Sequence, residues 1–167
     1  KLRYLSTHDA LTGLYNRAYF EEEMARLERG RHFPLSIVMV DVDWLKMTND
    51  RHGHAAGDEL LRRAARVLLD AFRAEDVVSR IGGDEFAVLL PSADARAANE
   101  AMQRVRHILA AHNASVNQTP LVLSLGIGTA SKGIPLTEAL QEADREMYQD
   151  KITHKGLATV SSGHSPG

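Results

Sequence analysis

Hydrophobic residues follow two spacings along this chain, and the two spacings predict alternating strands and helices. Residues 35–42 are almost continuously apolar and rich in β-branched side chains, which indicates a strand buried on both faces. Residues 77–81 and 86–90 are shorter runs joined by a pair of glycines, a pattern typical of a β-hairpin. Residues 121–129 predict one more strand.

Apolar residues at helical spacing predict helices between these strands. Asn16 can cap a helix that runs to about Gly30. Residues 55–72 carry an apolar stripe along one face, and residues 94–111 and 135–149 show the same spacing. The order α-β-α-β-β-α-β-α predicts the α/β (α+β) class, with a central mixed sheet flanked by helices.

The chain is expected to form one domain, because residues 9–155 contain no internal repeat and no linker. We place that domain at residues 9–160. Residues 1–8 are expected to be the end of an incoming signalling helix. Residues 161–167 carry Ser, Gly and Pro and are expected to form a disordered tail.

Composition narrows the range of partners and compartments. The formal net charge is only -2, so no overall field favours nucleic acid or an anionic membrane as a partner. The absence of cysteine excludes disulfides and thiolate metal sites, and it suits the cytoplasm. No apolar stretch approaches the roughly 20 residues that span a bilayer. We therefore expect a cytoplasmic domain that contacts neither nucleic acid nor membrane, within a parent protein that can carry a membrane anchor elsewhere.

Four acids gather where the predicted strands end. Asp41 and Asp43 close the first strand, and the period of two points both to one side of the sheet. Asp84 and Glu85 follow the glycines of the hairpin. Each pair alone can be a solvated turn or strand end. Together, Asp41 and Asp84 can meet around a hard cation such as magnesium, which takes one or two carboxylates plus phosphate oxygens.

A second polar cluster follows the acid pair directly. A turn that enters a helix here would offer backbone N–H groups to phosphates, and Lys46 adds a positive charge. Asn49 and Asp58 can together bind a guanine, because a carboxylate accepts hydrogen bonds from its N1 and N2 hydrogens. The alternative is that these residues, with His54, are ordinary capping and turn residues.

Three motifs in sequence order resemble the GGDEF diguanylate cyclase family. They are Asp9-Ala-Leu-Thr-Gly-Leu-Tyr-Asn-Arg17, then residues 41–50 with Gly53-His54 and Gly57-Asp58, and finally Gly82-Gly83-Asp84-Glu85-Phe86. The resemblance covers about residues 9–155. It implies a mostly antiparallel sheet like that of nucleotide cyclase and polymerase palm domains. It also implies an enzyme that condenses two GTP molecules into cyclic di-GMP and pyrophosphate.

The resemblance also assigns roles to single residues. The metal, Mg2+ or alternatively Mn2+, would be held by Asp41, Asp84, the Val42 carbonyl and Glu85. The catalytic residues would be Asp84 as proton acceptor, Glu85 at the metal and Lys46 against developing charge. The substrate would be bound by Asn49 and Asp58 at guanine, by His54, by backbone N–H groups near Trp44 and Leu45, and by Lys151 and Lys155 at phosphates.

Two positions depart from the family pattern. Leu45 stands where an aromatic residue is usual, which matters little if only its backbone contacts phosphate. His154-Lys155-Gly156 stands where the family often has Gly-Arg-Asn. Lysine keeps the positive charge of arginine but lacks its bidentate fork, so the binding of the triphosphate is the property at stake.

A further motif resembles the family's product-inhibition site. Arg73 and Asp76 match its Arg-x-x-Asp pattern, and Arg104 matches an arginine that often completes it. Arginine forks suit guanine edges and phosphates. The alternative is a charge pair at a helix end.

These assignments predict an enzyme that works as a pair. One chain offers one guanine site, whereas the product contains two GMP units, so two copies are expected to face each other. GTP is the expected substrate and cyclic di-GMP the expected product and inhibitor, with a sensor or receiver domain upstream. The alternatives are a catalytically silent domain that acts as a GTP or cyclic di-GMP receptor, and a related cyclase with another nucleotide product.

Overall fold

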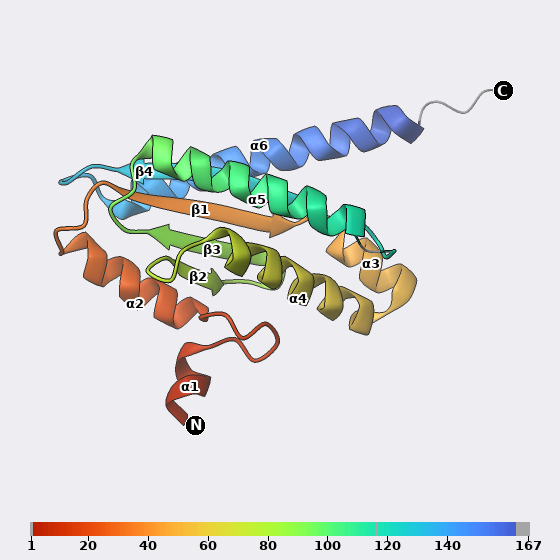
Figure 1. Cartoon of the computed structure of the whole chain (residues 1–167), viewed down its shortest axis with the longest axis horizontal. Helices are drawn as coiled ribbons and strands as arrows, with labels where there is room; N and C mark the ends of the chain where they lie inside the picture. Colours follow the sequence, from red (N-terminus) through yellow and green to blue (C-terminus); the bar gives the residue numbers. More distant parts are fainter. Residues whose placement is uncertain (1, 116, 163–167) are drawn as a thin grey trace.

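The computed structural model describes residues 2–115 and 117–162 of the chain. Its elements are α1 (Leu2–Thr7), α2 (Arg17–Glu28), β1 (Leu35–Val42), α3 (Leu45–His52), α4 (His54–Ala71), β2 (Val77–Arg80), β3 (Glu85–Leu90), α5 (Ala95–Ser115), β4 (Leu123–Ala130) and α6 (Leu136–Ser162). Figure 1 shows them arranged around one central sheet. None of the helices within the described ranges is both long and apolar enough to cross a membrane.

The four strands form one sheet in the order β2-β3-β1-β4, and each neighbouring pair is antiparallel. The expected parallel component is limited, in the described ranges, to an isolated bridge between Tyr15 and Ser79. β1 lies in the middle and is buried along its whole length, as its apolar run predicts. Its carboxyl end therefore meets β3 on one side and β4 on the other.

Helices cover both faces of the sheet. The face that includes Val38, Val40 and Phe86 packs against α4 and α5, and the face that includes Ile37 and Met39 packs against α2 and α6. In Figure 1, α4 and α5 lie in front of the sheet and α6 runs along its far side. Because side chains alternate along a strand, Asp41 has the same direction as Ile37 and Met39, toward α6.

Two glycines let α6 lie directly on the backbone of β4. A Cβ atom at Gly126 would lie 2.0 Å from the Ala143 carbonyl oxygen, and one at Gly128 would lie 1.7 Å from that of Ala139. No larger residue fits at either position without moving the helix. This close approach holds α6 beside the carboxyl end of β1.

Several predicted boundaries differ from the structure. The expected turn after the acid pair is a separate helix, α3, and the following helix begins at His54. α6 continues past the expected end near Gln149 as far as Ser162, so it includes the first two residues of the predicted tail. Residues 163–167 of that tail lie outside the described residues. α1 covers Leu2–Thr7 within the segment for which the end of a signalling helix is expected, and that signalling role stays a prediction.

Candidate active site

The carboxyl end of β1 and the β2–β3 hairpin bring Asp41 and Asp84 together. Asp41 stands opposite Glu85 in the β1–β3 ladder, and the Val42 N–H donates to the Asp84 carbonyl oxygen at 2.9 Å. Arg80 fixes the hairpin, because its guanidinium donates to the Gly83 carbonyl oxygen at 2.8 Å. The two carboxylates are close enough for Asp84 to shift the pKa of Asp41.

Asp41 is a buried acid whose surroundings disfavour its charged form. Asp41 is only 4% exposed, and this burial raises its pKa to about 6. The Lys151 hydrogen bond opposes the shift of the pKa, and the negative charge of Asp84 adds to it. Lys151 donates to Asp41 Oδ2 at 2.5 Å, and this hydrogen bond raises the pKa of Lys151. The other oxygen, Oδ1, is buried and has no hydrogen-bond partner among the described residues.

Asp43 points to the same side as Asp41, as the period of two predicts. Its Oδ2 accepts hydrogen bonds from Ser124 Oγ and from His154 Nδ1, each at 2.7 Å. Its Oδ1 is also buried, and no group in the described part of the chain forms a hydrogen bond with it. The end of β1 thus has two buried carboxylate oxygens that lack a partner among the described residues. Each of the two acids also contacts one side chain of α6, Lys151 at Asp41 and His154 at Asp43.

This arrangement fits a divalent cation that is completed by other ligands. Bare carboxylate oxygens beside a second acid are stabilised by a cation, because it removes both the desolvation penalty and the mutual repulsion. The described residues contain no group of three or more acidic or histidine side chains that could hold a metal alone. A cation bound by Asp41 and Asp84 would therefore take its remaining ligands from the Val42 carbonyl, water or a phosphate.

The raised pKa of Asp41 predicts that the free energy of unfolding of the metal-free protein falls as the pH rises. Because the folded pKa of about 6 lies above the ordinary 3.8, the folded state binds this proton more tightly than the unfolded chain does. The stabilisation that the protonated Asp41 gives to the folded state is fully present below about pH 4 and is lost as the pH rises through about 6. Asp41→Asn should therefore match the wild type near pH 4 and exceed its free energy of unfolding by about 2–3 kcal/mol near pH 7.5.

Urea unfolding in EDTA across this pH range measures that difference. Asp70→Asn, which replaces an exposed acid of α4, is the matched control and should show no such trend. A difference between Asp41→Asn and the wild type that does not change with pH would contradict the assignment.

A cleft beside these acids is lined by the start of α3 and by two lysines of α6. Its volume is about 570 Å3, and its lining residues are Val42, Trp44, Leu45, Lys46, Met47, Asp50, Arg51, Asp84, Lys151 and Lys155. The first N–H groups of any helix lack intrahelical partners and attract anions. The chain turns into α3 at Trp44, which has a φ of 65°. The cleft therefore combines helix N–H groups and lysines, which suits a chain of phosphates.

Leu45 lines this cleft and also packs against the hydrophobic core. Its side chain is half-buried and packs against the core cluster beneath α4 and α5. The departure from an aromatic residue at this position is therefore accommodated inside the fold.

The predicted guanine-binding residues lie at the junction of α3 and α4, outside the lining of that cleft. Asn49 is half-buried, and its Oδ1 is buried with no hydrogen-bond partner in residues 2–115 and 117–162. This side chain occupies the space left by Gly57, where a Cβ atom would lie only 1.8 Å from Asn49 Oδ1. Asp58 follows Gly57 directly and is half-buried, whereas His54 is exposed at the start of α4. The structure thus places Asn49 next to the Asp58 turn of α4.

A second cleft lies on the α6 side of the same acids. Its volume is about 720 Å3, and it is lined by Asp41, Glu85, Asp144, Arg145, Met147, Tyr148, Gln149, Lys151, Ile152 and Lys155. Lys151 and Lys155 therefore border both clefts. Sequence reasoning identified the two lysines but missed the bonds of Lys151 to Asp41 and of His154 to Asp43. The signal for these bonds was the helical spacing of residues 147–155 beyond the predicted end of the helix.

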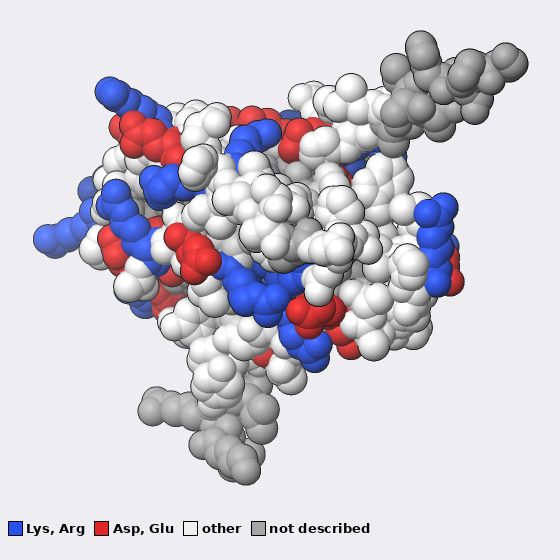
Figure 2. Space-filling view, turned by 45° about the vertical axis from the view of Figure 1, so that its right-hand side comes forward, with Lys and Arg blue, Asp and Glu red and all other residues white. Residues whose placement is uncertain are grey.

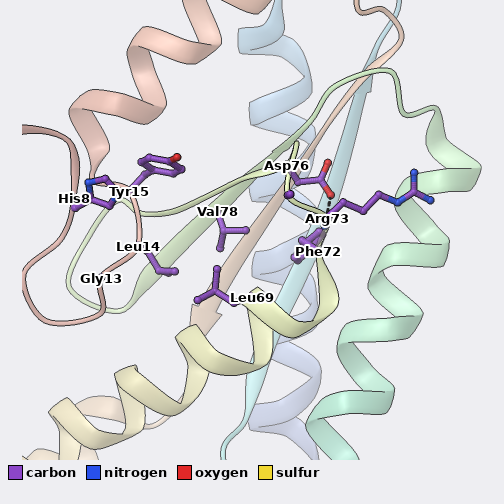
Figure 3. Close-up of a pocket in the computed structure, with 10 residues that line it drawn as sticks. His8, Gly13, Leu14, Tyr15, Leu69, Phe72, Arg73, Asp76 and Val78 are labelled. Carbon is purple, nitrogen blue, oxygen red and sulfur yellow. Dashed lines mark hydrogen bonds between the residues drawn. The ribbon is translucent and has the colours of Figure 1, made fainter. Parts of the chain in front are cut away.

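The predicted inhibitory residues gather at the other end of β2. Asp76 Oδ2 accepts from the Arg73 N–H at 2.9 Å, and Arg104 Nε donates to the Ala71 carbonyl oxygen at 3.0 Å. Burial raises the pKa of Asp76, while the positive charges of Arg73 and Arg104 oppose that shift. A cavity of about 340 Å3 adjoins them. Figure 3 shows Leu14, Leu69 and Val78 around this cavity, with the Arg73 guanidinium extended away from them.

Positive and negative charges are mixed on the face of the molecule that Figure 2 shows. Figure 2 shows basic and acidic side chains interspersed over the described part of one face, without a large area of one sign. Attraction of an anionic ligand must therefore be local, as the net charge of -2 indicates.

Residues 6–156 match the sequence profile of a family described as "Diguanylate cyclase, GGDEF domain". DgcE of Escherichia coli K12, a probable diguanylate cyclase, is 37% identical over 171 residues, covering 96% of this chain and 15% of that protein. The diguanylate cyclase DgcS of Shewanella oneidensis is 32% identical over 157 residues, covering 92% of this chain and 52% of that protein. The chain thus spans only part of the length of either relative.

Solved structures show the same fold. The diguanylate cyclase SiaD of Pseudomonas aeruginosa, in complex with its activator SiaC, superposes with a TM-score of 0.81 and 30% identity over 91% of this chain and 60% of that chain. The coiled coil and GGDEF domain of DgcB from Caulobacter crescentus, in complex with c-di-GMP, gives a TM-score of 0.82 over 91% of this chain and 84% of that chain. At 24% identity the second likeness shows the fold alone.

Proposed function

Because the chain belongs to the GGDEF diguanylate cyclase family, we propose that it is an active diguanylate cyclase that joins two GTP molecules into cyclic di-GMP. The observation that carries the proposal is the meeting of Asp41 and Asp84 beside a cleft lined by three lysines. Nucleotidyl transfer needs positioning and charge neutralisation more than covalent help, and this site offers both. We place the reaction in the cytoplasm, where GTP is available.

Different residues of the site bind different parts of GTP. Asn49 and Asp58 bind guanine, with His54 at the edge of that site. Backbone N–H groups near Trp44 and Leu45 bind phosphates, and Lys151 and Lys155 neutralise the far end of the triphosphate. Lys46 lies in the same cleft and stabilises the negative charge that develops as the bond to the leaving pyrophosphate breaks.

Asp84 accepts the proton in each bond-forming step. The ribose 3′-hydroxyl of one GTP attacks the α-phosphorus of the other, the bond to the β-phosphate breaks, and pyrophosphate leaves. The hydroxyl proton passes to the Asp84 carboxylate, while Glu85 supports the acid cluster. Mg2+ or Mn2+, held by Asp41, Asp84 and the Val42 carbonyl with Glu85 beside them, would supply charge neutralisation and lower the pKa of the hydroxyl.

Two copies of the domain are required for the product. Each chain has one guanine site and one acid cluster, so the attacking hydroxyl must come from a GTP that a second copy holds. Within the longer parent protein, we propose that an upstream sensor or receiver domain controls how often two copies meet.

Incubation with GTP and MgCl2, followed by mass spectrometry, tests the proposed activity. Cyclic di-GMP and pyrophosphate are expected, with a rate that falls faster than linearly as the protein is diluted. Tight binding of GTP or cyclic di-GMP without turnover would instead indicate a silent receptor domain. Product from ATP in place of GTP would indicate a cyclase of different base specificity.

We further propose that the product inhibits the enzyme through Arg73, Asp76 and Arg104. Arg73→Ala removes a guanidinium that can bind phosphate or guanine in bidentate fashion. The concentration of cyclic di-GMP that halves the rate should rise by about tenfold or more, while the uninhibited rate is retained. Initial rates with added cyclic di-GMP measure this, with exposed Arg96→Ala as control. Unchanged inhibition would exclude Arg73 from the product site.

A further inference from the structure

Helix α6 is attached to the edge strand β4 by polar side chains at every fourth position. The Ile127 N–H donates to Glu146 Oε2 at 3.3 Å, and the Leu125 N–H donates to Asp150 Oδ2 at 2.9 Å. His154 is the next residue in this row. Because residues four apart share one face of a helix, this row lies on the face of α6 that meets the sheet, beside the apolar Ala139, Ala143 and Met147.

His154 bonds to an acid that is almost completely buried. Its Nδ1 lies 2.7 Å from Asp43 Oδ2 and 3.1 Å from Ser124 Oγ. Asp43 is 4% exposed and Ser124 is 0% exposed. An ionised carboxylate only accepts hydrogen bonds, so Nδ1 is the donor. Bonds to a charged acceptor are shorter and stronger than neutral ones, and this one joins α6 to the end of β1.

The two lysines of the proposed triphosphate site each follow a residue of this row by one position. Lys151 follows Asp150, and Lys155 follows His154. One residue turns a helix by about 100°, so a row fixed against the sheet directs the neighbouring positions to one side of it. Both lysines line the cleft that also contains Lys46 and Asp84. The rotation of α6 therefore controls where these two positive charges lie.

The helix needs an anchor at this point. Residues 155–157 are exposed, and Figure 1 shows α6 extending beyond the sheet toward the carboxyl terminus. If His154 is removed, the last residue of the row that bonds to the sheet is Asp150, one helical turn before His154. Lys155 would then sit on a turn whose rotation is no longer set by a bond to Asp43.

We propose that His154 is a positioning residue that fixes α6 on buried Asp43 so that Lys151 and Lys155 face the triphosphate. The inference rests on the proposed function, because it assumes that the cleft binds GTP. It also gives a role to the departure from the family pattern at this position. A single lysine cannot form the fork of an arginine, and His154 restricts the turn that carries it.

Comparing the affinities for two nucleotides shows whether His154 positions the lysines or only stabilises the fold. The probes are GMP, which needs only the guanine site, and a GTP analogue with a methylene group between the α- and β-phosphates, both with MgCl2. His154→Ala and His154→Leu should weaken binding of the triphosphate by about 5- to 20-fold, because the lysine–phosphate contacts become less well positioned. Binding of GMP should stay within about twofold, because the α3–α4 junction is untouched.

A conservative variant and a neighbour complete the test. His154→Asn places an amide N–H near the position of Nδ1, so it should restore triphosphate binding to within about threefold of the wild type. Exposed Thr153→Ala, on the same turn of α6, should behave as the wild type. With GTP as substrate, KM should rise in His154→Ala while kcat is retained at saturation. Melting temperatures show whether each variant is folded, and His154→Leu keeps the volume of the side chain if His154→Ala is not.

Three results would overturn the inference. Triphosphate binding that is unchanged in both His154→Ala and His154→Leu shows that the bond to Asp43 does not direct the lysines. An equal loss for GMP shows a general structural role. A wild-type protein that binds neither nucleotide contradicts the proposed function itself, and the inference with it.

Discussion

Asp84→Asn is expected to lower the rate of cyclic di-GMP formation by about 10³-fold at saturating GTP, the range that loss of a general base produces. The change removes both the proton acceptor and one of the two acids that meet at the end of β1. It leaves the fold in place, because only the backbone carbonyl of Asp84 bonds to the Val42 N–H. Initial rates of product formation by chromatography measure the effect.

Asp70→Asn is the matched control for this substitution, since it replaces an exposed acid of α4 and should keep the wild-type rate. Retention of more than about a tenth of the activity by Asp84→Asn would show that another group accepts the proton.

Gly57→Ala is expected to raise the KM for GTP by about 10- to 100-fold while the domain stays folded. The new methyl group would lie 1.8 Å from Asn49 Oδ1 and 2.7 Å from Asn49 Cγ, so the Asn49 side chain must leave its place. Loss of one or two hydrogen bonds to guanine accounts for an effect of this size. Because alanine favours a helix over glycine by about 1 kcal/mol, the melting temperature need not fall.

A double-mutant cycle with Asn49→Ala identifies the cause. If Gly57→Ala acts by displacing Asn49, the double variant should have the KM of Asn49→Ala alone. Additive effects would show that Gly57 is needed for another reason, such as direct approach of the base to the backbone of α4.

The sequence predicted the architecture because most of its elements have strong local patterns. The apolar run at residues 35–42 predicts a buried strand, and the two runs joined by glycines predict a hairpin beside it. It missed α3, because that helix is short, mostly polar, and buries only Thr48. It ended α6 too early, because beyond Met147 the face of the helix that meets the sheet is made of Asp150 and His154, which form hydrogen bonds there. An apolar stripe cannot reveal a polar contact.

The candidate site was predictable in its residues but only partly in its contacts. Motifs named Asp41, Asp84 and Lys151, and the structure places all three together. The bond of Lys151 to Asp41 joins residues 110 positions apart, and no local pattern carries that information. The orientation of Asn49 depends equally on space left by a glycine of the next helix. Such contacts follow from packing and were visible only in the folded chain.

The central claim is that acids from β1 and from the hairpin bind a divalent cation together with a triphosphate. Paramagnetic broadening of amide NMR signals by Mn2+, added with the methylene analogue of GTP, tests it most directly. The account predicts that broadening centres on residues 41–43 and 84–85, extends to Lys46 and Lys151, and is absent in Asp41→Asn. Broadening centred elsewhere, or equal in the wild type and Asp41→Asn, would contradict it.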